Sequence, residues 1–155
     1  MVRRSTDSNL NVADKKLLAT LEQWGWYVLK VGAGESTPPF AYSVGLYEHF
    51  KHPEIIILGL DLDTMHHLIN DAGKQIRLGH HYESGHKYSD LLAHYECEFR
   101  SVAPGRYDRF LNYALWYYGG LHFPALQLVW PDRHGRFPWE QHFDKRFRED
   151  QVVLE

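Results

Sequence analysis

Apolar residues along this chain follow two spacings, one typical of helices and one typical of strands. Spacings of three and four predict helices that start at Asn11 or Asp14, at Asp61 or Asp63, and near Tyr107. Each of these segments is followed by a glycine, the usual residue after the last helical turn: Gly25, Gly79 and Gly119. Alternating or continuous apolar runs predict five strands, at 26–31, 40–46, 54–60, 95–102 and 125–130.

Two of these strands have informative patterns. In the segment 40–46, bulky residues alternate with Ala41, Ser43 and Gly45, which predicts a strand with one bare face. That face has room for a helix or for a flat ligand, and the helix is the favoured interpretation. The run Ile55–Leu60 is continuously apolar, which indicates a central strand buried on both faces.

The order of elements predicts an α+β fold. We expect a single domain over residues 11–155, with a mixed, twisted central sheet or half-barrel and about three flanking helices. Residues 1–10 are polar and are expected to form a flexible N-terminus without a secretory signal. The longest apolar run is far shorter than the roughly 20 residues that span a bilayer, so we expect a cytoplasmic protein with no membrane partner.

Composition narrows the function classes. The chain has 155 residues, 44% hydrophobic and 24% charged, with a net charge of −3. That charge predicts no binding to nucleic acid. The lone cysteine, Cys97, excludes an internal disulfide, and its neighbours Glu96 and Glu98 disfavour a reactive thiolate. Aromatic residues make up 15% of the chain and there are 11 histidines, which are the unusual features.

Two stretches of the sequence carry a family resemblance. The chain resembles the bacterial domain-of-unknown-function family 4262 in both stretches. The first is Pro38–Leu46 followed by His52-Pro53-Glu54, and the second is Leu115–Gly120 followed by Phe123–Asp132. The resemblance extends over about 22–153 and implies an architecture without a defined activity. A shorter similarity, of a small-residue strand, a proline loop and an apolar strand, is to flavin-binding split-barrel proteins. It would imply a bound flavin, and no other cofactor is predicted.

Histidine 52 and glutamate 54 are the candidate catalytic residues. His52 lies beside Glu54 where a loop enters a buried strand, and such a pair can hold or move a proton. A small hydrolase would use His52 and Glu54, with His86 or Asp132 as a third group. The alternative is that Pro53 fixes the direction of the loop while its neighbours satisfy backbone groups.

Aromatic residues crowd the segment 116–139 and point to binding. Most should belong to the core, but an excess would line a pocket or a partner surface. We expect a pocket made by the 32–39 loop, the 47–53 loop and the turn after Trp130. Its ligand is an unknown small planar molecule or another protein, and the oligomeric state is not predicted. The expected ligand-binding residues are Tyr42, Ser43, Trp116, Trp130, Asp132 and Trp139.

Two further possibilities concern the histidines and the C-terminal segment. The helical His-x-x-x-His pattern of zinc sites is absent, and no metal is predicted. His66 and Asn70 flank the apolar face of their helix and are better placed than His67 to reach a site. A pure interaction protein would instead expose an apolar patch near Phe143 and Phe147.

Overall fold

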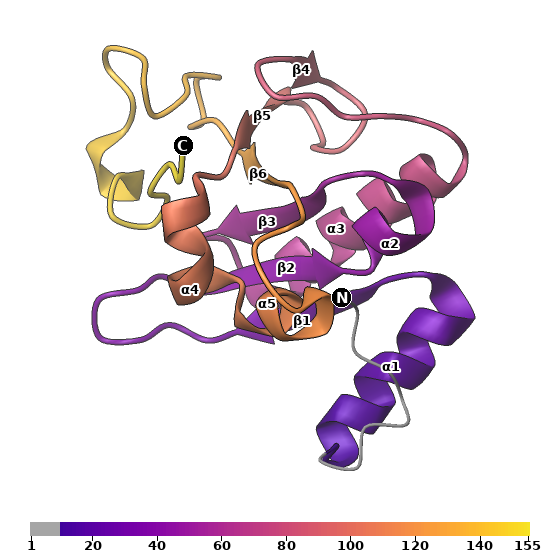
Figure 1. Ribbon diagram of the computed structural model, residues 1–155. Helices are drawn as coiled ribbons and strands as arrows, with labels where there is room; N and C mark the ends of the chain where they lie inside the picture. The colour runs from indigo at the N-terminus through magenta and orange to yellow at the C-terminus, as the bar shows by residue number, and fades with distance from the viewer. Residues whose placement is uncertain (1–9) are drawn as a thin grey trace.

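The computed structural model describes residues 10–155, so the segment expected to be flexible lies outside the described residues except for Leu10. A six-stranded sheet forms its centre, in the order β1-β2-β3-β6-β5-β4 (Figure 1). Only β3 and β6 run parallel among these neighbours, and the other pairs are antiparallel. The α+β class with a mixed sheet is therefore confirmed, and the sheet is open, ending at β1 and at β4. The strands are β1 (Tyr27–Val31), β2 (Phe40–Val44), β3 (Glu54–Leu58), β4 (Lys87–Tyr88), β5 (Cys97–Ser101) and β6 (Ala125–Val129).

Helices cover both faces of the sheet. On one face, α3 (Leu62–Arg77) buries Met65, Ile69 and Ala72 against the strands. On the other, α1 (Val12–Trp24), α4 (Tyr107–Phe110) and α5 (Asn112–Tyr118) complete a second apolar cluster. Ala41, on the bare face of β2, is fully buried in the cluster that contains α3. The interpretation that a helix packs on this face is thus confirmed.

Local sequence explains where the helices begin and end. Asn11 caps α1 with a reciprocal hydrogen bond to Asp14, and Gly25 ends it at a φ of 96°. Asp61 caps α3 through its side chain alone, by accepting from the Thr64 N–H group.

The number of helices differs from the prediction: the described residues contain five α-helices, not three. The expected third helix is broken at Leu111, whose φ of −119° and ψ of 41° leave the helical region, so it forms α4 and α5. The strand expected to reach residue 46 stops at Val44. Gly45 turns there with a φ of 114° and starts the short helix α2 (Leu46–Phe50). Two 3₁₀ turns, η1 (Pro104–Arg106) and η2 (Lys145–Phe147), complete the chain.

Strand register decides which loops share an end of the sheet. Phe40 pairs with Leu58 and Tyr42 with Ile56, so the loop before β2 lies at the end where β3 finishes. Since β6 runs parallel to β3, the turn after Trp130 lies at that same end. The 47–53 loop lies at the opposite end, where β2 finishes and β3 begins. The expected pocket made by these three loops is therefore wrong.

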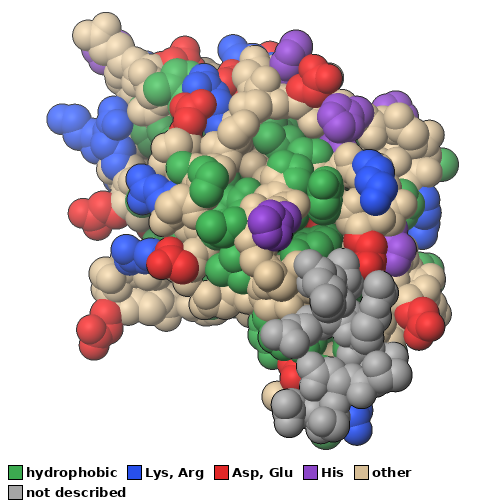
Figure 2. Space-filling view, viewed as in Figure 1, with side chains coloured by type: hydrophobic (Ala, Val, Ile, Leu, Met, Phe, Trp, Pro, Cys, Tyr) green, Lys and Arg blue, Asp and Glu red, His purple; other side chains and the backbone are tan. Residues whose placement is uncertain are grey.

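The surface seen in Figure 2 mixes residue types. Apolar side chains gather near the middle of this face, while Lys and Arg are interleaved with Asp and Glu around its margin. Among residues 10–155, none of the helices combines the length and the apolar character needed to cross a bilayer.

Candidate functional site

Glu54 stands at the start of β3 and is completely buried. Its carboxyl accepts five hydrogen bonds, from the hydroxyls of Ser43 and Tyr118 and from the backbone N–H groups of Gly45, Leu46 and Tyr47. The Ser43 Oγ donates over 2.7 Å and in turn accepts from the Ile55 N–H group over 2.9 Å. The two stretches that carry the family resemblance meet at this carboxyl, because Ser43 and Gly45 come from the first and Tyr118 from the second.

Two opposing effects act on this carboxyl. Burial raises the pKa of Glu54 above its ordinary value, while the hydrogen bonds from Tyr118 and Ser43 act against that rise. All five partners donate, which is the pattern that an ionised carboxylate accepts. The carboxyl also lies at the positive, N-terminal end of α2. Its role here is to join β2, α2, β3 and α5.

His52 is also buried, with 1% of its surface exposed. Its Nδ1 lies 2.8 Å from the Pro53 carbonyl oxygen, and its Nε2 accepts from the Tyr82 N–H group over 3.0 Å. These partners assign the proton to Nδ1 in a neutral ring. Burial lowers the pKa of His52 to about 4, which keeps the ring neutral at pH 7.

In the described part of the chain, no residue forms hydrogen bonds with both the His52 side chain and the Glu54 side chain. His52 contacts the loop of Tyr82, which belongs to the cluster under α3, whereas Glu54 binds Tyr118 in the cluster on the other face. A hydrolase would require both groups in one water-accessible cleft, with a third polar group nearby. The geometry instead fits the structural interpretation, in which each satisfies backbone groups.

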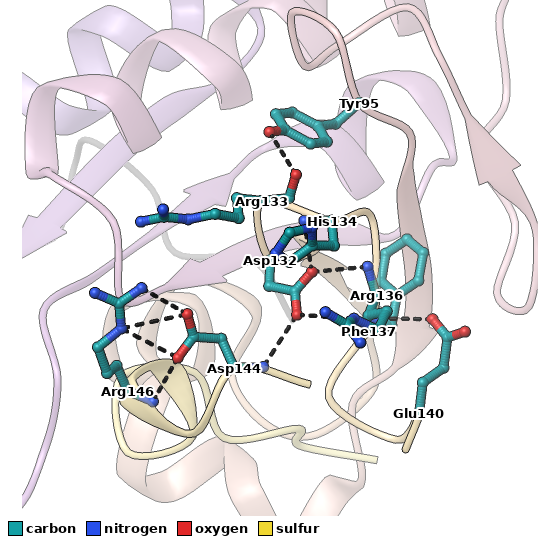
Figure 3. A network of polar contacts seen from close by, with 9 residues as sticks. All are labelled: Tyr95, Asp132, Arg133, His134, Arg136, Phe137, Glu140, Asp144 and Arg146. Carbon is teal, nitrogen blue, oxygen red and sulfur yellow. Dashed lines mark hydrogen bonds and ion pairs between the residues drawn. The ribbon is translucent and has the colours of Figure 1, made fainter. Parts of the chain in front are cut away.

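Asp132 holds the turn after β6 together (Figure 3). Its carboxyl accepts from the backbone N–H groups of His134, Arg136 and Asp144 over 2.9 to 3.0 Å. Burial by itself would raise the pKa of Asp132, but the hydrogen bonds from Arg136, Asp144 and His134 outweigh it and lower the pKa. Figure 3 shows the carboxyl aimed into the turn, with its oxygens occupied by these contacts.

The remaining expected ligand-binding residues lie apart from one another. The Tyr42 hydroxyl accepts from the Tyr113 N–H group over 2.9 Å, on the face that carries α5. The Trp130 indole donates to the Leu58 carbonyl over 2.7 Å in the opposite cluster. Trp116 lines a small hollow beside α1, and Trp139 is half-exposed at the surface. The structure therefore does not gather these residues into one aromatic-lined site.

Trp139 and the C-terminal phenylalanines are held by local contacts. The Trp139 ring stacks on Phe137 with an angle of 5° between the rings, and the Arg100 guanidinium lies 3.8 Å from its centre. Phe143 is 2% exposed, and Phe147 packs against Trp130. The exposed patch expected of a pure interaction protein is therefore not formed by these two residues.

The structure describes the surroundings of the cysteine and of the possible metal ligands. Cys97 is fully buried, and burial raises the pKa of its thiol to about 12, so the thiolate is disfavoured as expected. No three His, Cys, Asp or Glu side chains between residues 10 and 155 are grouped so that they could hold a metal ion.

A groove at the β1 edge of the sheet is a hollow in which several polar groups converge. We call it the basic groove; its volume is about 520 Å³. One wall is α1, the other is α3, and β1 with the preceding Trp26 forms the floor. It is lined by Lys16, Thr20, Trp24, Trp26, Tyr27, Val28, Lys30, His66, Asn70, Lys74 and Arg77.

Helical periodicity produces the two walls. Lys16, Thr20 and Trp24 recur every four residues and so form one stripe along α1, beside the buried leucines. In α3, residues 66, 70, 74 and 77 form a matching stripe beside the buried Met65–Ile76 face. Each helix therefore buries one stripe and presents another to the groove.

The groove is positively charged. Four cations line it, namely Lys16, Lys30, Lys74 and Arg77, and none of its lining residues is Asp or Glu. Lys30 lies 3.6 Å from Asp63, but both side chains are exposed, so this ion pair is weak. Burial lowers the pKa of His66, and the positive charge of Lys30 lowers it further. An anion is the complementary ligand for such a site.

Two tryptophans make the groove partly aromatic. The Trp26 indole donates to Asn70 over 2.9 Å, and the Arg77 guanidinium lies 5.3 Å from its ring centre. Trp24 is 52% exposed, although large aromatic side chains usually lose more of their surface on folding. Sequence reasoning noted only that His66 and Asn70 flank the apolar face of their helix, and it did not single out the lysines. The four-residue spacing of Lys16, Thr20 and Trp24 was the available signal.

Comparison with known proteins gives one match. The family model described as Domain of unknown function (DUF4262) matches residues 20–144. Neither the curated proteins nor the solved structures contain a match to this chain. The family match includes both stretches quoted for the first resemblance, whereas nothing supports the similarity to flavin-binding split-barrel proteins.

Proposed function

The chain belongs to the DUF4262 family, and we propose that it is a binding module that holds an anionic ligand in the basic groove. This proposal keeps the binding function expected from the sequence but moves its site. The ligand lies between α1 and α3 at the edge of the sheet, and not at the turn after Trp130.

One observation carries the proposal: the groove is lined by cations and by no carboxylate, and Asp63, which is exposed and 3.6 Å from Lys30, is not among its lining residues. The whole chain has 17 Lys and Arg residues against 20 Asp and Glu residues. A patch of its surface as large as the groove would therefore ordinarily contain both basic and acidic side chains. The groove has four cations and no carboxylate, and they come from three separate elements. Like charges brought together in a concave site repel one another, and an anion relieves that repulsion.

The lysines offer a clean test, because Lys16 and Lys74 are both exposed and stand on opposite walls. The double substitution Lys16→Glu with Lys74→Glu reverses two groove charges without removing a buried contact. Lys15→Glu with Lys145→Glu is the matched control, since both lysines are exposed and neither lines the groove. Both variants change the net charge of the chain equally.

Each protein is titrated with sodium tripolyphosphate at low ionic strength, and tryptophan fluorescence is followed. We expect the original chain and the control to bind, with affinity falling as salt rises, and the groove variant to bind about tenfold more weakly or worse. Equal binding by the two double variants would contradict the proposal, as would no binding by the original chain.

A further inference from the structure

We infer that the natural ligand of the basic groove is an acidic, extended peptide segment that adds a strand to β1; this inference rests on the proposed function. The peptide would pair with β1 through its backbone and place carboxylates against the groove lysines. Strand addition at a sheet edge uses backbone hydrogen bonds for affinity and alternate side chains for specificity.

β1 has an unpaired edge. Within residues 10–155 it is the terminal strand of the sheet and pairs with β2 alone. Every second residue of such a strand directs its N–H and C=O groups away from its partner. Among residues 10–155, no other backbone or side chain forms a hydrogen bond with the backbone of residues 27–31. These groups are available to a further strand.

Hollows lie beside β1 toward both faces of the sheet. The basic groove adjoins the α3 side, where Val28 is buried. A second hollow, which we call the apolar hollow for its Leu, Val and Phe side chains although Thr37, Arg109 and Asn112 also line it, has a volume of about 450 Å³ and lies on the side of α4 and α5. Leu29, Val31, Phe40 and Phe110 are among its lining residues, and Lys30 lines both hollows. A strand laid along β1 would therefore have space on both of its faces.

The two hollows predict the pattern of the peptide. Side chains of an extended strand point alternately to opposite faces, so every second residue would enter the basic groove and the others the apolar hollow. Acidic residues suit Lys30, Lys74 and Arg77, and apolar residues suit Leu29 and Val31. A compact polyanion would use only the basic groove and would leave the apolar hollow and the β1 backbone without a partner.

The test uses a capped octapeptide of alternating Glu and Val, with two N-methylated forms. One form is methylated at every Val nitrogen and the other at every Glu nitrogen. In an extended strand these two sets of N–H groups lie on opposite edges. With the Glu side chains in the basic groove and the peptide running in one fixed direction along β1, only one edge faces β1.

We expect the octapeptide to bind the chain, one methylated form to bind about tenfold more weakly, and the other to bind as well as the parent. The Lys16→Glu, Lys74→Glu variant should lose binding of all three. If both methylated forms bind like the parent, the peptide is held by charge alone and strand addition is overturned.

The two proposals fail in different ways. Binding of tripolyphosphate through Lys16 and Lys74, without binding of the octapeptide, would overturn the peptide inference and leave the anion site standing. If neither probe binds, both proposals are contradicted.

Discussion

His52 connects two loops because each of its ring nitrogens has a backbone partner. One is the Pro53 carbonyl beside it and the other is the Tyr82 N–H group, from a segment far along the chain. A charged ring would have to donate from both nitrogens, and Tyr82 would then present a donor to a donor. Burial and this pattern of partners together hold the ring neutral, as the lowered pKa of about 4 reflects.

This arrangement predicts how stability changes with pH. The pKa of His52 is about 4 in the folded chain and 6.5 as the ordinary value, so the unfolded chain binds the proton first as the pH falls. The contribution of the neutral His52 ring to the unfolding free energy is complete above pH 6.5, declines as the pH falls below that value, and is lost near pH 4. Between pH 7.5 and 5.0 the loss should be about 2 kcal/mol of unfolding free energy.

Urea unfolding of the original chain and of His52→Gln at both pH values measures this term. Glutamine can donate and accept but does not titrate, so the variant should lose about 2 kcal/mol less on acidification. The other ionisable groups are common to both proteins and cancel in the difference. The same pH dependence in both proteins would show that His52 is not held neutral.

The hydrogen bonds of Glu54 lead to a second prediction about stability at the scale of single residues. Glu54→Gln replaces a carboxylate oxygen by an amide nitrogen that cannot accept from its neighbours, so it should lower the unfolding free energy by about 3 kcal/mol or more. Tyr118→Phe removes one donor and should cost about 2 kcal/mol. Denaturant unfolding of both variants shows which substitution lowers the unfolding free energy more. A smaller effect for Glu54→Gln than for Tyr118→Phe would argue against an ionised, five-bonded carboxylate.

At the scale of elements, the packing of α3 on β1 depends on one glycine. A Cβ atom on Gly73 would lie 2.6 Å from the Trp26 ring, which is too close. Alanine is a better helix former than glycine, but here Gly73→Ala should lower stability by about 1–3 kcal/mol through overpacking. Because the Trp26 indole would have to move, its hydrogen bond to Asn70 should weaken and its fluorescence should change.

The control for this effect is Gly105→Ala. A Cβ atom there has no neighbour within 4 Å, so the substitution should change stability by less than about 0.5 kcal/mol. Denaturant unfolding of the two variants compares their unfolding free energies with that of the original chain. If Gly73→Ala is as harmless as Gly105→Ala, close packing of α3 over Trp26 does not limit the fold.

Element boundaries could be predicted where a local signal sets them. Asn11 and Asp61 cap helices through bonds to residues three positions on, and Gly25 ends α1 by its positive φ. The turn at Gly45 depends on distant residues. Gly45 is surrounded by Leu21 and the Gly25 backbone, and its N–H group binds Glu54. Such contacts do not affect the spacing of apolar residues along the chain, so that spacing cannot predict them.

At the scale of the whole molecule, the basic groove depends on three elements meeting at one sheet edge. The sequence indicates α1, β1 and α3 separately. It does not indicate that β1 ends the sheet, which brings Lys16 and Lys74 to opposite walls of one groove. The sequence instead indicates a binding site at the aromatic segment 116–139, because its aromatic residues are close in sequence. Its rings are divided between the two faces of the sheet.

Amide hydrogen exchange across the whole chain, with and without the alternating Glu-Val octapeptide, tests the central claim most directly. The measurement reports which backbone N–H groups gain protection, without assuming where the ligand binds. We predict slower exchange in residues 26–31, with smaller changes in the facing parts of α1 and α3. Unchanged exchange in β1, with protection elsewhere or nowhere, would contradict a ligand site at this edge of the sheet.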